Sequence, residues 1–440
     1  MPPWQARWFG SNSYQLRFVA SKSLLNLCRI KTGAYHTAQT KVACANVSCR
    51  PYDSFLPEIA VEIQCLDAGY CFILDTIGII EVSASALTES FASDFHPATE
   101  YRQHLLAFHH PSVPNPRIVL CYPVEERHIR QIQRSCPAAT VVNAGQERIA
   151  EELPTADIFC GHAKVPVPWD ETIAAGRLRW IQSSAAGLDH CLVPSVVASG
   201  VTVTSASGVL ADQVAEQAMA LVTACTRRIP LFLQQQQQRE FIRRPTRDLT
   251  GSTVLIVGFG GNGRRLAEVL APWKTRLLAT DYFPDQPATG LDQLAGPDAF
   301  RRLLPEADIV MLAAPLTAET RGMIDAEAVS QMKRGSILIN VARGGLVVEP
   351  AVVAGLESGQ LDSAGFDVTP EEPPSAASPL WDAPGLVITP HVGGQSVHRI
   401  DRMTDLFSAN LVRYSQGLPL INAVDKQLGF PSPDGPPLPF

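Results

Sequence analysis

The stretch TVLIVGFGGNGRRLAEVL (Thr253–Leu270) decides the fold of this chain. It begins as an apolar run, passes through the pattern Gly258-x-Gly260-x-x-Gly263, and continues with the spacing of a helix. A strand that leads through such a glycine turn into a helix is the arrangement that dinucleotide binding needs. The glycines permit a tight turn, close approach of a pyrophosphate and contact between helix and sheet. The first N–H groups of the helix are then available to the phosphates.

Asp281 ends the next apolar run, TRLLATD (275–281), and lies 18 residues beyond Gly263. A carboxylate at this place can accept hydrogen bonds from both ribose hydroxyls and repels a 2′-phosphate, so NAD is favoured over NADP. The alternative is an ordinary strand–turn–helix with a solvated aspartate. The strand, the helix and the acid together favour the dinucleotide site.

Short apolar runs recur after residue 253, and helical stretches separate most of them. The runs are 253–260, 275–281, 307–315, 336–342, 363–368 and 386–392. Strands that alternate with helices predict a doubly wound parallel sheet. Similar strand-then-turn units lie between residues 116 and 213. Because 440 residues exceed what one hydrophobic core normally serves, we predict an α/β protein with two domains.

Three further segments complete this prediction. Residues 211–233 have the pattern of one long helix, which the glutamine run Gln234–Gln238 extends. Residues 399–417 have the pattern of an amphipathic helix. A Pro-rich tail follows from Phe430, and we expect it to be disordered.

The composition limits the possible partners. The net charge of −7 gives no basic patch for nucleic acid, and the chain has no apolar run of the length of a membrane span. The ten cysteines form no CxxC pair and no Cys/His cluster with zinc spacing, so we predict no metal site and reduced thiols. The expected location is cytoplasmic.

Residues 1–115 fit neither sheet pattern. Residues 1–52 hold seven Lys or Arg and no acidic residue, which is also typical of a mitochondrial targeting segment. A disordered extension and a translated region upstream of the true start remain as alternatives. We assign residues 1–115 no function.

Polar residues follow the later strands, at the edge where doubly wound sheets bind ligands. Arg343 follows one strand, Asp367 and Glu372 the next, and His391 the last. Singly, each has an ordinary explanation as a strand cap or a loop residue. Jointly, the guanidinium of Arg343 can hold a carboxylate or polarise a carbonyl. His391 can exchange a proton near neutral pH, and a neighbouring carboxylate would orient it.

These residues stand in motifs that resemble the D-isomer-specific 2-hydroxyacid dehydrogenases, over about Arg117 to Lys426. The motifs, in the order of the family, are WIQSSAAGLDH (180–190), SGVLADQVAEQAMAL (207–221), GFGGNG with Asp281, APLTAETRGMID (314–325), INVARGGLV (339–347), DVTPEEP (367–373) and TPHVGG (389–394). The family implies a Rossmann-type NAD-binding domain and a smaller, flavodoxin-like substrate domain. It places the former at 214–394 and assembles the latter from 116–213 and 395–428, with 429–440 as the tail.

The resemblance also implies roles for single residues. Arg343, Glu372 and His391 match the catalytic trio; Glu372 is chosen over Glu371 because the acid of the family precedes the proline. Cofactor contacts are implied for Gly258, Gly260, Gly263, Asp281, Pro315 and Asp367, the last toward the nicotinamide carboxamide. The backbone of Ala186 and Gly187 matches the turn that holds the substrate carboxylate.

The implied activity is hydride transfer between NAD(H) and a D-2-hydroxy acid or 2-oxo acid, such as glyoxylate or hydroxypyruvate, by a homodimer. One departure is Ala185, where many members have glycine. Formate dehydrogenases are disfavoured because they have glutamine where Glu372 stands. Phosphoglycerate dehydrogenases with a regulatory domain are disfavoured because none follows Lys426. A different class of function remains open, an NAD-sensing binding protein without catalysis, like the C-terminal-binding-protein corepressors of the same fold.

Overall fold

The computed structural model describes residues 113–440 and seven strands between residues 6 and 81. The chain divides into two compact units, Met1–His104 and Leu105–Phe440. In the first unit, five strands form an antiparallel sheet in the order β1-β2-β5-β6-β7, and β3 pairs with β4. The strands are β1 (Ala6–Phe9), β2 (Ser13–Phe18), β3 (Arg29–Thr37), β4 (Thr40–Ser48), β5 (Ile59–Leu66), β6 (Tyr70–Asp75) and β7 (Gly78–Glu81). The rest of the predicted extension up to residue 112 lies outside the described residues.

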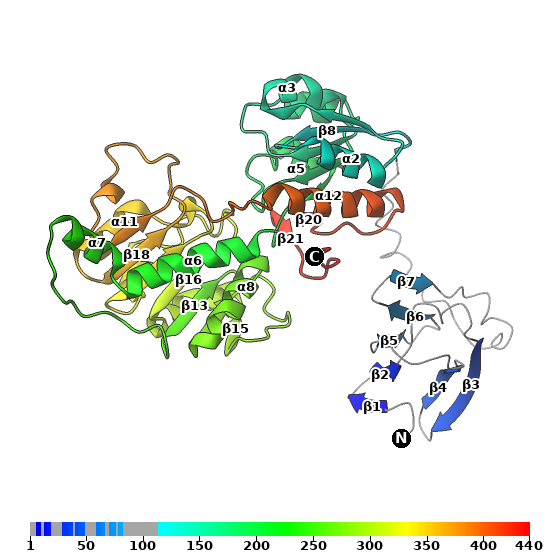
Figure 1. The fold of residues 1–440 in the computed structure, drawn as a ribbon, viewed down its shortest axis with the longest axis horizontal. Helices are drawn as coiled ribbons and strands as arrows, with labels where there is room; N and C mark the ends of the chain where they lie inside the picture. Colours follow the sequence, from blue (N-terminus) through cyan, green and yellow to red (C-terminus); the bar gives the residue numbers. More distant parts are fainter. Residues whose placement is uncertain are drawn as a thin grey trace. The chain divides into compact units, whose positions relative to one another are not determined.

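The glycine motif lies in a seven-stranded sheet with the order β15-β14-β13-β16-β17-β18-β19 (Figure 1). Its strands are β13 (Thr253–Val257), β14 (Arg276–Thr280), β15 (Gln293–Ala295), β16 (Ile309–Leu312), β17 (Ser336–Asn340), β18 (Leu361–Phe366) and β19 (Leu386–Ile388). Every neighbouring pair is parallel. Because the strand order reverses between β13 and β16, the carboxyl ends there form the edge where such sheets bind ligands. The predicted doubly wound sheet is confirmed.

Helices cover both faces of this sheet, which is why its central strands are mostly apolar. Val254 and Ile256 pack on one face with α6 (Ala211–Thr226) and α8 (Gly261–Leu270). Leu255 and Val257 pack on the other face with three helices. These are α9 (Phe300–Leu303), α10 (Ala326–Gln331) and α11 (Glu349–Glu357). Short 3-10 helices lie at η5 (Leu153–Thr155), η6 (Ala271–Trp273), η7 (Pro297–Ala299), η8 (Leu304–Glu306), η9 (Gly344–Leu346) and η10 (Pro379–Trp381).

A second parallel sheet has the order β12-β11-β10-β8-β9. Its strands are β8 (Arg117–Cys121), β9 (Thr140–Asn143), β10 (Ile158–Gly161), β11 (Trp180–Ser183) and β12 (Thr202–Thr204). Its helices are α2 (Glu126–Ser135), α3 (Gly145–Glu152), α4 (Trp169–Ala174), α5 (Pro194–Ala198) and α12 (Arg399–Ser415). Phe407 of α12 lies 5.4 Å from the ring of Trp180, so the C-terminal helix completes the core of this sheet (Figure 1). None of the helices in the described part of the chain is long and apolar enough to cross a membrane.

The prediction of one helix from 211 to 233 is wrong. Helix α6 ends at Thr226, and a second helix, α7, runs from Ile229 to Gln237. Between them, Arg228 has a left-handed backbone with φ of 53°. Pro230 has no N–H for a preceding helical turn, so it stands in the first turn of a new helix.

The prediction of a disordered tail is also wrong. Phe430 and Pro431 form strand β21, which pairs with β20 (Val424–Asp425). The Phe430 ring lies 5.7 Å from that of Tyr282, and the Phe440 ring lies 5.8 Å from the guanidinium carbon of Arg402. The aromatic residues at the two ends of the tail thus contact side chains far away in the sequence, a tertiary effect that the composition does not reveal.

Candidate active site

The glycine turn between β13 and α8 has the geometry that a dinucleotide requires. Gly258 has φ of +96°, and a Cβ there would lie 2.6 Å from Cα of Ala314. A Cβ at Gly263 would overlap the carbonyl oxygen of Gly258. Gly260 caps α8 with open space around it, and the first turn of α8 has no acidic residue, so a phosphate can approach the helix N-terminus. Pro315 follows Ala314 and is exposed beside this turn.

Asp281 stands directly beside the glycine turn, at the end of β14. Its Oδ2 accepts a hydrogen bond from the backbone N–H of Phe259 at 2.6 Å, and its Oδ1 accepts from that of Phe283 at 2.9 Å. Both contacts fix the carboxylate at the carboxyl edge of the sheet, and each oxygen retains a further lone pair. The glycine turn and Asp281 therefore fit the diphosphate and the ribose of a nicotinamide dinucleotide.

Arg343 follows the buried strand β17. The side chain of Asn340 holds the turn, because its Nδ2 donates to the carbonyl of Arg343 at 2.9 Å and its Oδ1 accepts from the N–H of Ala342 at 3.1 Å. The guanidinium donates to the Ala342 carbonyl at 2.7 Å and contacts Asp189 of the other sheet, with Nε 3.3 Å from Oδ2. The side chains of Arg343 and Asp189 are 28 % and 58 % exposed, so solvent screens much of this ion pair.

Gly187 lies in the loop after β11 and is in close contact with the guanidinium of Arg343. A Cβ at Gly187 would overlap the guanidinium, so only glycine allows this contact. Among the described residues, no acceptor lies within hydrogen-bond distance of the N–H groups of Ala186 and Gly187. Two free N–H groups beside a guanidinium form a site for a carboxylate.

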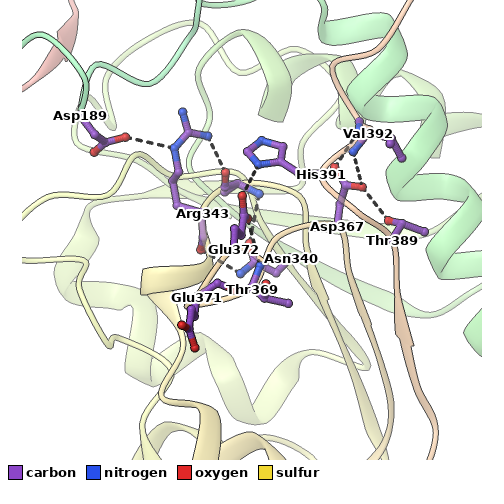
Figure 2. A network of polar contacts seen from close by, with 12 residues as sticks. Asp189, Asn340, Arg343, Asp367, Thr369, Glu371, Glu372, Thr389, His391 and Val392 are labelled. Atoms are coloured by element: carbon purple, nitrogen blue, oxygen red, sulfur yellow. Dashed lines mark hydrogen bonds and ion pairs between the residues drawn. The ribbon is translucent and has the colours of Figure 1, made fainter. Parts of the chain in front are cut away.

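His391 and Glu372 form a hydrogen-bonded pair, with Nδ1 2.7 Å from Oε2 (Figure 2). The other oxygen of Glu372 accepts from the N–H of Thr369 at 3.2 Å. The structure brings Glu372 rather than Glu371 to the imidazole. His391 itself has φ of 53°, in the left-handed region that non-glycine residues seldom adopt.

Asp367 is buried and lies beside the segment Thr389–Val392, which carries His391 (Figure 2). Its carboxylate accepts from the Thr389 hydroxyl at 2.6 Å and from the N–H groups of Val392 and Gly393 at 3.0 and 2.7 Å. These bonds fix the loop that carries His391. Contact of Asp367 with a nicotinamide carboxamide stays a prediction.

A pocket of about 340 Å³ joins these groups, with walls from both sheets. Its lining residues are His162, Gly187, Asp189, His190, Leu316, Arg343, Gly344, Gly345, Thr369, Pro370, Glu372 and His391. Among the residues that the structure describes, no group of three or more His, Cys, Asp or Glu side chains could hold a metal. The pocket can thus bind an anion, polarise a carbonyl and exchange a proton.

Sequence reasoning missed four residues of this site. His162, Asp189 and His190 line the pocket from the loops that follow β10 and β11. Asn340 holds the turn at Arg343. The signal for the first three was present, because each follows the end of a strand of the parallel sheet. The sequence signal for Asn340 is weaker: it is only an amide side chain in a mostly apolar strand.

The sequence and the fold have known relatives. Residues 219–393 match the model of the family "D-isomer specific 2-hydroxyacid dehydrogenase, NAD binding domain". Glycerate dehydrogenase of Methylorubrum extorquens is 32% identical over 283 residues, which are 62% of this chain and 87% of that protein. Hydroxypyruvate reductase of Thermotoga maritima is 29% identical over 289 residues, 64% of this chain and 89% of the relative.

A solved structure gives the same result. The D-isomer specific 2-hydroxyacid dehydrogenase of Xanthobacter autotrophicus Py2, in complex with NADPH and MES, is 25% identical and has a TM-score of 0.61. The similarity covers 72% of this chain and 100% of that chain. The predicted two-domain fold and the predicted family are therefore confirmed. This chain belongs to the D-isomer specific 2-hydroxyacid dehydrogenases, oxidoreductases that transfer a hydride between NAD(P)(H) and a 2-hydroxy or 2-oxo acid.

Proposed function

We propose that this enzyme reduces short 2-oxo acids, such as glyoxylate and hydroxypyruvate, to the D-2-hydroxy acids with NADH, and that Arg343, Glu372 and His391 carry out the reaction. The observation that carries the proposal is their convergence with Gly187 in one pocket. The two relatives above act, by their names, on glycerate and on its oxidised form, hydroxypyruvate.

In this proposal, the substrate carboxylate lies between the domain of the seven-stranded sheet and the domain of the five-stranded parallel sheet. The free N–H groups of Ala186 and Gly187 donate to it, and the Arg343 guanidinium, already in contact with Gly187, adds a charge-assisted bond. The planar fork of Arg343 also reaches the neighbouring carbonyl oxygen and polarises it. These contacts orient C2 for reaction.

His391 supplies the proton. Its Nδ1–H is bound to Glu372, so Nε2 is the nitrogen that gives its proton to the carbonyl oxygen. Glu372 holds the ring in this orientation and stabilises the imidazolium before transfer. When bound, NADH supplies the hydride that is added to C2. In the oxidation of a 2-hydroxy acid, Nε2 takes the hydroxyl proton instead.

NADH is the proposed cofactor because Asp281 places a negative charge where a 2′-phosphate would lie. Gly258, Gly260 and Gly263 would hold the diphosphate, with Pro315 and Asp367 at the nicotinamide half. The relative of known structure binds NADPH, so the choice of cofactor needs its own test at Asp281.

We further infer a cytoplasmic homodimer in which residues 214–394 bind NAD, and in which 116–213 with 395–428 bind the substrate. A chain that starts at Asn115 should then fold and keep full activity, whereas a mitochondrial segment in residues 1–52 would be needed only for targeting. Light scattering of the purified protein should give the mass of two chains. A monomer, or an insoluble shortened chain, would contradict these inferences.

The test of the proposed function is turnover. The purified protein is assayed by NADH absorbance with glyoxylate, hydroxypyruvate, pyruvate and 2-oxobutyrate, each also with NADPH. We expect reduction of glyoxylate and hydroxypyruvate with NADH. A protein that binds NADH and reduces none of them would instead act as a cofactor-sensing binding protein.

A further inference from the structure

Two imidazole rings form a part of the pocket wall that has no role in the proposed reaction. The rings of His162 and His190 are stacked, with centroids 3.9 Å apart and an angle of 19° between their planes. Both line the pocket on the side of the parallel sheet β12-β11-β10-β8-β9, and both are half-buried. The pair therefore faces the same space as Arg343 and His391.

His190 is the fixed member of the pair. Its Nε2 lies 3.4 Å from the hydroxyl of Ser183, and the ring also bonds to the backbone of Gly161. Burial, together with the neighbouring His162 and Arg343, lowers the pKa of His190 to about 3. The ring is uncharged at neutral pH and serves as a rigid platform for His162.

The main chain of His162 is equally fixed. Its N–H donates to the carbonyl of Cys121 at 3.0 Å, and its carbonyl accepts from the side chain of Gln146 at 2.8 Å. The ring nitrogens, in contrast, have no hydrogen-bond partner among the described residues. Burial, followed by the charges of Lys164, Arg399 and Arg343, lowers the pKa of His162, so this ring is uncharged as well. It offers one donor and one acceptor to the pocket.

The other polar side chains of the pocket are already engaged. Asp189 is paired with Arg343, and the Thr369 hydroxyl donates to the carbonyl of Glu371. Glu372 and His391 bind each other. In the proposed reaction, the carboxylate and the carbonyl oxygen at C2 already have partners, and the hydride comes from the cofactor. The one substituent of C2 without a partner is the C3 group. His162 is the lining residue left to recognise that group.

We propose that the stacked pair His162–His190 determines substrate specificity, and that His162 hydrogen-bonds an uncharged hydroxyl at C3 of the 2-oxo acid. This inference rests on the proposed function. A hydroxyl donates and accepts at once, which matches a neutral imidazole. An alkyl group at C3 would instead leave the ring nitrogens without partners.

The test compares hydroxypyruvate with pyruvate, which differ by this one hydroxyl. In the wild-type enzyme, kcat/KM for hydroxypyruvate should exceed that for pyruvate roughly tenfold, the upper range for one net hydrogen bond. His162→Leu should bring the ratio near one, and His162→Asn, which keeps a donor and an acceptor, should restore part of it. His398→Leu, the same change at an exposed histidine outside the pocket, is the matched control and should keep the wild-type ratio.

The role of His190 as a positioning residue is tested by the same ratio. His190→Leu removes the stacking platform and should lower the ratio about as much as His162→Leu. His190→Phe keeps a planar ring beneath His162 and should restore the ratio in part. A thermal melt of each variant shows whether it is folded, and because a ratio of two substrates is measured on one sample, a loss of folded protein does not change it.

Glyoxylate, which has no C3, separates the two possible failures. If the wild type reduces glyoxylate but His162→Leu leaves the ratio for the other two substrates unchanged, the specificity proposal is overturned and the proposed function stands. If no 2-oxo acid is reduced, the proposed function fails and the specificity proposal fails with it.

Discussion

Nδ1 of His391 lies 2.7 Å from Oε2 of Glu372, although 19 positions of sequence separate the two residues (Figure 2). An ionised carboxylate can only accept a hydrogen bond, so Nδ1 carries the proton and Nε2 is left for the substrate. The second oxygen of Glu372 is fixed by the N–H of Thr369, so the carboxylate cannot turn away without losing that bond.

Glu372→Gln should therefore lower kcat for 2-oxo acid reduction by about tenfold to a hundredfold, the range for one charge-assisted hydrogen bond. Glutamine still offers an oxygen to Nδ1–H but not the charge that stabilises the imidazolium. Glu371→Gln is the control, because its side chain is not at the imidazole, and it should stay within about twofold of the wild type. Equal losses in both variants would exclude a role for the pair.

Arg343→Lys preserves the charge at the end of β17 but not the planar fork. We expect kcat/KM to fall by about tenfold to a hundredfold, shared between KM and kcat because the carboxylate and the carbonyl are adjacent in a 2-oxo acid. NADH affinity, measured by fluorescence, should barely change. Arg334→Lys, at a site away from the pocket, controls for the substitution itself. If Arg343→Lys only lowers the melting temperature and leaves the kinetics intact, Arg343 is a structural strand cap.

Gly187→Ala tests the approach of the guanidinium to the carboxylate turn. The added methyl group would overlap Arg343, so the side chain must move away and KM for 2-oxo acids should rise at least tenfold. Gly200→Ala is matched to it, because a Cβ there meets no atom within 4 Å, and its kinetics should equal those of the wild type. Unchanged kinetics in Gly187→Ala would show that the contact is dispensable.

Cofactor choice should depend on Asp281. We expect the wild type to prefer NADH over NADPH and Asp281→Ser to reduce that preference at least tenfold, because like charges in contact typically cost several kcal/mol. Dissociation constants for both cofactors, from protein fluorescence, measure this directly. Asp285→Ser removes an exposed acid of the same loop and should leave the preference as it is. Equal affinity of the unaltered enzyme for both cofactors would contradict the assignment.

The half-buried imidazole of His190, whose pKa is lowered, should make the fold less stable in acid. Its pKa is lowered from 6.5 to about 3, so between these values the unfolded chain binds a proton that the folded chain does not. The stabilisation is present above pH 6.5 and is lost as the pH falls toward 3. Between pH 7 and pH 5 this group should remove on the order of 2 kcal/mol of unfolding free energy. Denaturant unfolding of His190→Gln should lack this part of the pH dependence, whereas His398→Gln should retain it.

The sequence by itself determined the nucleotide-binding half of the protein. Gly258, Gly260 and Gly263 are required by local backbone geometry, and the apolar runs are required by strands that are buried on both faces. Such features depend on near neighbours in the chain, so they can be recognised without a structure. The strand ends likewise placed Arg343, Glu372 and His391 at one edge of the sheet, since the carboxyl ends of parallel strands lie together.

Only the tertiary structure decided which groups meet across the two sheets. The contact of Arg343 with Gly187, the stacking of His162 on His190, and the packing of Phe430 against Tyr282 all join residues from separate elements. The break between α6 and α7 at Arg228, in contrast, had a local signal in Pro230, which the prediction of one continuous helix did not use. Contacts between separate elements arise only when whole domains have folded and packed. The periodicity of a single segment contains no information about its distant partners.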